Sequence, residues 1–293
     1  MKKNKKVSSA DILNYIFFAI VAFISLFPIY LIAANAFSTE ADVKNIGFAV
    51  FPLHPTIKAF QYILKSPAQL LYSLRGSIVY AAGGSFVAVL IQAMLGYALT
   101  RDEFPFKGIC KYMLLFTMFF SAGLIPSYMV NTEIFHLNDS WFVYLLPNTV
   151  SAFAVFIYRT FFRQIPQSLI ESAELDGASN MQLLMKIIIP LSMPVLAAQY
   201  FMALSGRWKD FSQTLYYISD MKKYTLEYYI QYLLNNAESM KNNLLLMGIP
   251  ADSIPLETMR FAVVFFTLIP MVCILPFFQK KFAKGAMVGA VKG

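Results

Sequence analysis

Charged side chains are scarce in this chain of 293 residues. Asp, Glu, Lys and Arg together make up 14% of the sequence, whereas soluble domains carry about 25%. A water-exposed surface of ordinary size needs more charge than this. The shortage argues against a soluble globular protein.

Cysteine and histidine are equally rare, with two of each. Cys110 and Cys273 lie in or beside apolar runs without C-x-x-C spacing, which excludes a disulfide framework. His54 and His136 lack neighbouring cysteine or histidine at zinc-ligand spacing. We therefore expect no metal site.

Two further classes are excluded by what the sequence does not contain. The phosphate-binding pattern G-x-x-x-x-G-K-[ST] is absent, so the chain is not itself an ATPase and binds no cofactor. The net charge is +8, but the basic residues are spread between apolar blocks and do not gather on one helix or tail. Nucleic-acid binding is not expected.

Apolar residues are abundant: they form 58% of the chain, and the mean hydropathy is +0.58. A helix needs about 20 mostly apolar residues to cross a bilayer. The sequence predicts an all-α integral membrane protein with a single transmembrane domain over 1–293. Its six predicted spans lie near 12–37, 76–99, 112–130, 141–158, 187–206 and 261–278.

The distribution of basic residues predicts the orientation of the spans. More than half of the 24 Lys and Arg fall within 1–11, 100–111, 159–186 and 279–293. Because basic residues are retained on the cytoplasmic side of a membrane, these segments and both termini are predicted to be cytoplasmic. Two long outer segments, 38–75 and 207–260, remain.

The segment 164–190, between predicted spans four and five, has the signals of two short helices joined by a tight turn. Pro166 suits the first turn of one helix, and Gly177 suits the left-handed residue that ends it. Ser179 followed by Gln182 is a capping-box pattern that starts the second helix. The sequence predicts a cytoplasmic elbow here.

This elbow resembles the EAA loop of ABC-importer permeases, E-A-A-x3-G-x9-I-x-L-P. Glu171-Ser172-Ala173, Gly177, Ile187 and Ile189-Pro190 keep the spacing, with Ser172 and Ile189 as small departures. Ile125-Pro126, the approach from Arg159 to Pro166 and the tail from Gly289 to Gly293 are also similar to the carbohydrate-uptake group of type I importers, in particular to the second permease of maltose-type systems.

The resemblance implies the function and the partners. The elbow would be the coupling helix, which docks on a nucleotide-binding subunit that uses ATP and Mg²⁺. The implied complex has a second homologous permease, two nucleotide-binding ATPase subunits and an extracytoplasmic solute-binding protein, in the lipid of a bacterial inner membrane. The implied coupling residues are Glu171, Ser172, Ala173, Asp176, Gly177, Ala178 and Ser179.

Substrate and outer contacts are predicted from residue type alone. Sugar sites combine aromatic rings with a few amides and hydroxyls. The candidates in the spans are Gln92, Asn148, Ser151, Gln199, Tyr200 and Ser205. Candidates for contact with the binding protein are Trp208, Asp210, Tyr216 and Tyr217. An ion-coupled secondary transporter, a channel-like or structural membrane protein, and an ABC permease for a non-sugar solute remain alternatives.

Overall fold

The computed structural model describes residues 9–247 and 254–290, and in these residues the secondary structure is helical. The N-terminal lysines and the last three residues, on which part of the sequence prediction rested, lie outside the described residues. The chain forms two compact units: residues 1–67 with 230–269, and residues 68–229 with 270–293.

Unit 1 contains three whole helices and parts of two more. The whole helices are α1 (Ser9–Ala36), α2 (Glu40–Ile46) and α3 (Lys58–Ile63). Most of α14 (Leu226–Leu246) and the first part of α15 (Leu256–Ala290), as far as Ile269, also belong to it, and the other residues of these two helices belong to unit 2.

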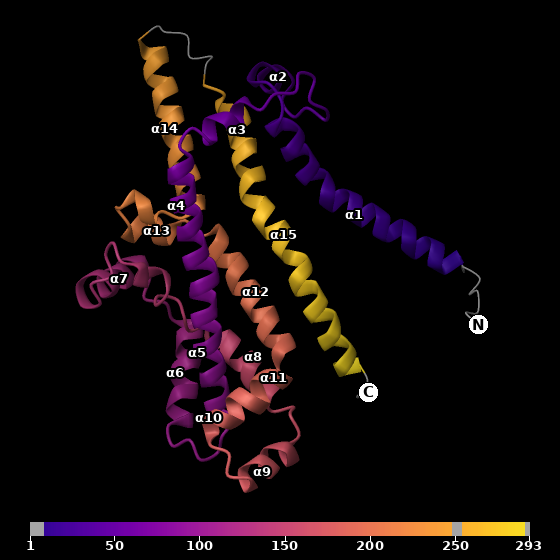
Figure 1. Cartoon of the computed structure of the whole chain (residues 1–293), viewed down its shortest axis with the longest axis vertical. Helices are drawn as coiled ribbons and strands as arrows, with labels where there is room; N and C mark the ends of the chain where they lie inside the picture. The colour runs from indigo at the N-terminus through magenta and orange to yellow at the C-terminus, as the bar shows by residue number, and fades with distance from the viewer. Residues whose placement is uncertain (1–8, 248–253, 291–293) are drawn as a thin grey trace. The chain divides into compact units, whose positions relative to one another are not determined.

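Unit 2 holds the rest of the chain (Figure 1). Its α-helices are α4 (Pro67–Ser77), α5 (Gly84–Ala98), α6 (Lys107–Phe119), α7 (Leu124–Met129), α8 (Ala152–Phe162), α9 (Gln167–Leu175), α10 (Asn180–Leu183), α11 (Ile189–Leu191), α12 (Met193–Lys209) and α13 (Ser212–Tyr217). Three π-helical segments, Ile78–Gly83, Val130–Ile134 and Leu184–Ile188, and two 3-10 turns, Trp141–Tyr144 and Met221–Lys223, complete it.

Among the described residues, three helices are long and apolar enough to cross a membrane: Asp11–Ala36, Pro67–Ala98 and Leu256–Phe278. A fourth candidate is a bent pair, Asn180–Leu191 with Met193–Lys209, whose halves meet at 82°. Pro194 lacks an N–H group to donate to the carbonyl four residues earlier, which favours a break at Ser192. Four of the six predicted spans thus overlap such helices, although the fifth is bent.

Two further predicted spans, 112–130 and 141–158, are not continuous helices, so the predicted count of six spans is not confirmed. In 112–130, α6 ends at Phe119, and Gly123 has a left-handed φ of 84° before α7 begins. In 141–158, Pro147 and the left-handed Asn148 (φ 57°) precede α8. The helices that remain, α6 and α8, have 13 and 11 residues, fewer than the roughly 20 that a straight span needs.

Glu40 connects three helices of unit 1. Its Oε2 accepts hydrogen bonds from the backbone N–H groups of Glu257 (3.0 Å) and Thr258 (3.2 Å) in the first turn of α15. Its Oε1 lies 3.4 Å from Lys241 Nζ of α14 and 3.7 Å from Lys44 Nζ of α2. The first amides of a helix have no partner within it, so this carboxylate caps α15 from another part of the chain.

We expect Glu40→Ala to destabilise unit 1 by about 1–2 kcal/mol, because two amides lose their acceptor and a half-buried lysine loses its counter-ion. The measurement is the thermal unfolding midpoint of the full-length chain in detergent. Glu238→Ala is the matched control, since the Glu238 side chain is 48% exposed and contacts Arg260 at 3.4 Å. Equal midpoints for the two variants would contradict the assignment.

The core of unit 2 joins the helices that carry the elbow. Helix α5 packs against α8 and α12 (Figure 1). The buried side chains come from α5, α8, α9 and the bent pair: Val89, Ala93, Tyr97, Ala154, Tyr158, Phe162, Ile170, Leu183, Leu184, Ile188, Val195 and Leu196. One apolar core therefore reaches from the long helix α4–α5 to α9.

Candidate functional site

The elbow, residues 164–190, has the predicted local structure. Helix α9 ends at Leu175, and Gly177 follows with φ 81°. Ser179 Oγ accepts from the N–H of Gln182 (3.4 Å), while Gln182 Oε1 accepts from the N–H of Ser179 (2.9 Å). The two helices, the left-handed glycine and the capping box are thus confirmed. Pro166 lies one residue before α9 and not in its first turn.

The predicted coupling residues divide into two groups by exposure. Ala173 and Ala178 are half-buried and pack against the core of unit 2. The other five form an exposed polar face: Glu171, Ser172, Asp176, Gly177 and Ser179. The elbow therefore has an inner apolar side, held by its own chain, and an outer side available to another molecule.

Leu175 is the elbow residue that sequence reasoning missed. Its side chain is 89% exposed at the end of α9. Ile170, buried at 8% exposure, marks the inner side of this helix, and a residue five positions later lies off that side. The five-residue spacing between Ile170 and Leu175 could therefore have predicted from the sequence that Leu175 is exposed. An exposed leucine beside Glu171 and Asp176 gives the outer side an apolar contact point.

The segment that follows α5 holds the inner side of the elbow. Arg101 Nη2 lies 2.5 Å from Glu174 Oε1 of α9, and Tyr97 Oη donates to Asn180 Oδ1 of α10 at 3.3 Å. In the same segment Lys107 Nζ lies 2.6 Å from Asp102 Oδ1, and this hydrogen bond holds the pKa of the Asp102 carboxyl below its usual range. One ion pair, Arg101 with Glu174, and one hydrogen bond, Tyr97 with Asn180, thus connect parts of the chain that are far apart in sequence.

Of the six predicted substrate-path residues, Tyr200 and Asn148 line two different cavities. Gln92 is buried and donates to the Thr149 carbonyl at 2.7 Å, and Tyr200 Oη donates to the Ala82 carbonyl at 3.2 Å. Ser151 caps α8. The remaining three are the exposed Asn148, the half-buried Gln199 and Ser205, whose buried Oγ has no hydrogen-bond partner among the described residues.

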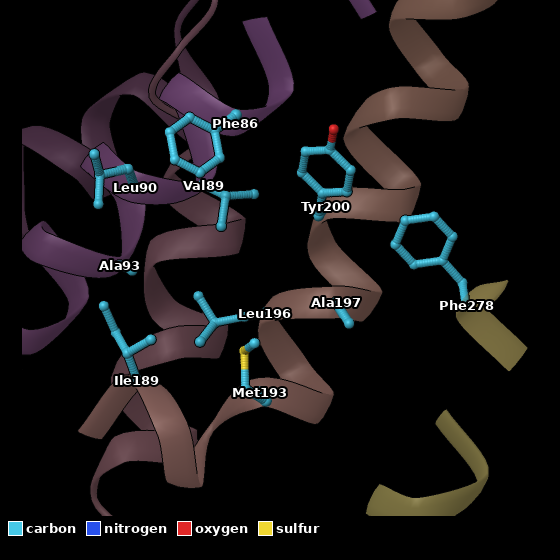
Figure 2. A pocket seen from close by; sticks show the side chains of 10 residues that line it. All are labelled: Phe86, Val89, Leu90, Ala93, Ile189, Met193, Leu196, Ala197, Tyr200 and Phe278. Carbon is cyan, nitrogen blue, oxygen red and sulfur yellow. The ribbon is translucent and has the colours of Figure 1, made fainter. Parts of the chain in front are cut away.

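Tyr200 borders an apolar cavity of about 390 Å³ between α5, the bent pair and α15 (Figure 2). The Tyr200 and Phe278 rings stack at 5.8 Å between centroids. The other lining residues are Phe86, Val89, Leu90, Ala93, Ile189, Met193, Leu196 and Ala197. Since the tyrosine hydroxyl already bonds Ala82, this lining offers the hydroxyls of a sugar little to bond.

The predicted outer contacts are partly internal. Trp208 and Tyr217 are buried at 7% and 5% exposure, whereas Tyr216 is 38% exposed. Asp210 accepts hydrogen bonds from Tyr80 Oη (2.5 Å) and from the N–H of Ser212 (2.8 Å). In this conformation, only Tyr216 of these side chains has an exposed ring to offer a partner.

The titratable residues outside the elbow include one His–Asp pair and two cysteines. No cluster of three or more His, Cys, Asp or Glu with metal-site geometry occurs among residues 9–247 and 254–290. His54 Nδ1 lies 3.1 Å from Asp42 Oδ1, and hydrogen bonds from Thr39 and from His54 lower the pKa of the Asp42 carboxyl. Cys110 and Cys273 are free.

A helical membrane chain with an exposed helix–turn–helix elbow defines the class of protein, and sequence comparison gives the family. The family model for binding-protein-dependent transport system inner membrane components matches residues 7–287. This chain belongs to that family. Its members are permease components of ABC transporters and not ATPases themselves.

Individual relatives are similar over nearly the whole chain. The protein LplC of Bacillus subtilis is 31% identical over 285 residues, covering 97% of this chain and 95% of LplC. The polygalacturonan/rhamnogalacturonan transport system permease protein YtcP of B. subtilis is 30% identical, covering 97% and 98%. A chain from the crystal structure of a bacterial ABC transporter that imports the acidic polysaccharide alginate aligns with a TM-score of 0.78 at 26% identity, covering 95% of this chain and 100% of that one.

Proposed function

We propose that this chain moves an oligosaccharide or polysaccharide fragment across a bacterial cytoplasmic membrane as one permease of an ATP-driven importer. The substrate class is supported by YtcP, a polygalacturonan/rhamnogalacturonan permease, and by the importer of the polysaccharide alginate. The elbow carries the proposal: its polar outer side and the exposed Leu175 have no partner in the core of their own chain.

The partners follow from the same proposal. The chain pairs with a second, homologous permease, and two nucleotide-binding subunits hold ATP and Mg²⁺. The exposed elbow residues contact one nucleotide-binding subunit, so that its closure displaces α9 as a rigid piece. An extracytoplasmic binding protein delivers the sugar, with the outer segment 207–260 and Tyr216 as its contact region.

The topology within the proposal is six spans with both termini and the elbow in the cytoplasm. The basic residues near the elbow, Arg101, Lys107, Arg159 and Arg163, support this orientation. The broken segments 112–130 and 141–158 would then cross as interrupted spans, which are tolerated where neighbouring protein satisfies the freed backbone groups.

Co-purification tests the proposed function directly. The chain is expressed with the permease, ATPase and binding-protein genes that neighbour it, and we expect a complex of two permeases and two ATPase subunits by mass measurement. In liposomes, uptake of neutral and acidic oligosaccharides should require both ATP and the binding protein. The control omits the ATPase subunit.

Two results would count against the proposal. A stable homo-oligomer that transports without ATP would indicate an ion-coupled secondary transporter or a channel. A complete complex that takes up amino acids or peptides, and none of the oligosaccharides, would keep the ABC permease and overturn the substrate class.

A further inference from the structure

Helix α9 is connected by the chain to α8 on one side and to α10 and the bent pair on the other. Helix α5 has no such connection, because Arg101, three residues beyond its end, is 73 residues from Glu174 in sequence. Any displacement of α9 therefore reaches α5 through side-chain contacts alone. Those contacts decide whether the long helix α4–α5 moves together with its neighbours.

The polar contacts between the two segments are few and directional. Arg101 Nη2 meets Glu174 Oε1 at 2.5 Å, with the arginine side chain 16% exposed and the glutamate 36% exposed. Short hydrogen bonds between two charged groups are the strongest of their kind. Tyr97 Oη adds the bond to Asn180 beyond the turn, so both halves of the elbow are held.

An open space lies beside the apolar core at this point. The pair borders a cavity of about 380 Å³ that is lined by Thr100, Arg163, Gln167 and Glu174 among others, so the segment after α5 and α9 are not packed tightly around it. The hydrophobic effect is non-directional and permits sliding. The hydrogen-bonded ion pair of Arg101 and Glu174, in contrast, is directional and favours one orientation of α9 relative to the segment after α5.

Arg101 has a second acidic neighbour. Glu103 Oε2 lies 3.2 Å from Arg101 Nη2, with its side chain 74% exposed. Both residues lie on the same short segment, so this contact cannot link that segment to α9. Variants of Glu103 and Glu174 can therefore be compared: both remove a negative charge next to Arg101, but only the Glu174 variant removes the contact between Arg101 and α9.

We propose that Arg101 and Glu174 form a positioning pair that fixes α9 to the end of α5, so that the displacement of the elbow moves α4–α5 together with α8 and α12. The inference rests on the proposed docking of the elbow on the ATPase subunit. The pair transmits motion and touches neither ATP nor sugar. Its loss lowers both uptake and the stimulation of ATP hydrolysis by the binding protein while the complex stays assembled.

The test uses the assembled transporter in liposomes with its binding protein. Arg101→Gln and Glu174→Gln each remove one charge, and the exchange variant R101E/E174R restores the pair with its polarity reversed. We expect each single variant to lose uptake by on the order of fivefold, a typical coupling effect. Stimulation of ATP hydrolysis by the binding protein should fall in parallel, with basal hydrolysis unchanged, and the exchange variant should recover most of the loss.

Glu103→Gln and Asp102→Asn are the matched controls. Both remove a carboxylate from the same segment, and neither contacts α9. They should transport as the unchanged protein does. A merely structural effect would lower basal and stimulated hydrolysis equally, so the ratio between them identifies a positioning role.

The outcomes that overturn the proposal are specific. Glu174→Gln with full uptake and full stimulation would overturn it, and so would an exchange variant no better than the single variants. Gly177→Val in the same preparation separates this failure from that of the proposed function. If Gly177→Val is damaging and Glu174→Gln is not, the elbow couples without the pair; if neither is damaging, the elbow's role itself fails.

Discussion

Gly177→Val is expected to reduce uptake at least tenfold while the chain still reaches the membrane in normal amount. Gly177 has φ 81°, a conformation that costs an L-residue about 1–2 kcal/mol and a β-branched one more. The turn depends on it, since the N–H of Gly177 bonds the Glu174 carbonyl (3.0 Å) and the N–H of Ala178 bonds the Ala173 carbonyl (2.9 Å). The measurements are uptake, membrane level and recovery of the ATPase subunit on pull-down.

Two causes could explain a loss of uptake in Gly177→Val: strain in the backbone of the turn, and the added bulk of the side chain. A Cβ at Gly177 would meet no atom of the chain within 4 Å, so internal clash is not the cause. Gly177→Asn adds similar bulk but tolerates the left-handed conformation. If Asn preserves uptake and Val does not, strain in the turn is responsible. Normal uptake by the Val variant would remove the elbow from the mechanism.

The elbow was predictable because its signals are local. Gly177 requires one backbone conformation, and Ser179 with Gln182 specifies a helix start within four residues. Local signals, however, do not predict which side of the elbow faces the core. Sequence placed Ala173 and Ala178 with the docking residues, whereas both face the core, because their orientation depends on how α9 lies against distant helices.

The interrupted spans show why apolar runs alone are insufficient. The residues of 112–130 and 141–158 satisfy a hydropathy criterion, which adds up side chains and ignores backbone conformation. Gly123 and Asn148 nevertheless adopt left-handed φ values in the non-helical stretches that precede α7 and α8. The long helices of 12–37, 76–99 and 261–278 were predictable because no such residue interrupts them.

The sugar path predicted from polar residues within the apolar segments stays a prediction. Gln92 and Tyr200 were selected for their hydrogen-bonding groups, and both donate to backbone carbonyls of neighbouring segments. A polar group in a spanning helix needs a partner whether or not a substrate passes it. The ion pair between Arg101 and Glu174 could not be predicted from the sequence either, because 73 residues separate the two.

The close contact between α5 and α8 depends on a single glycine. A Cβ at Gly96 would lie 2.7 Å from Tyr158 Cβ, 3.2 Å from the Arg159 backbone nitrogen and 3.2 Å from the Val155 carbonyl oxygen. Two of these are backbone atoms, and the third is the Cβ of a fully buried tyrosine, so none can move aside cheaply. Small residues allow helices in membranes to approach in this way.

Gly96→Val is therefore expected to destabilise unit 2 by about 1–3 kcal/mol or more, the usual cost of overpacking a filled core. The readouts are the amount of folded chain extracted from membranes and its thermal unfolding midpoint in detergent. Gly206→Val in α12 is the matched control, since a Cβ there meets no atom within 4 Å. Tyr158→Ala should not rescue Gly96→Val, because the obstructing atom is the Tyr158 Cβ, which alanine retains. A Gly96→Val chain that unfolds at the midpoint of the unchanged protein would show that α5 and α8 do not meet at this glycine, and the core that supports the elbow would need another arrangement.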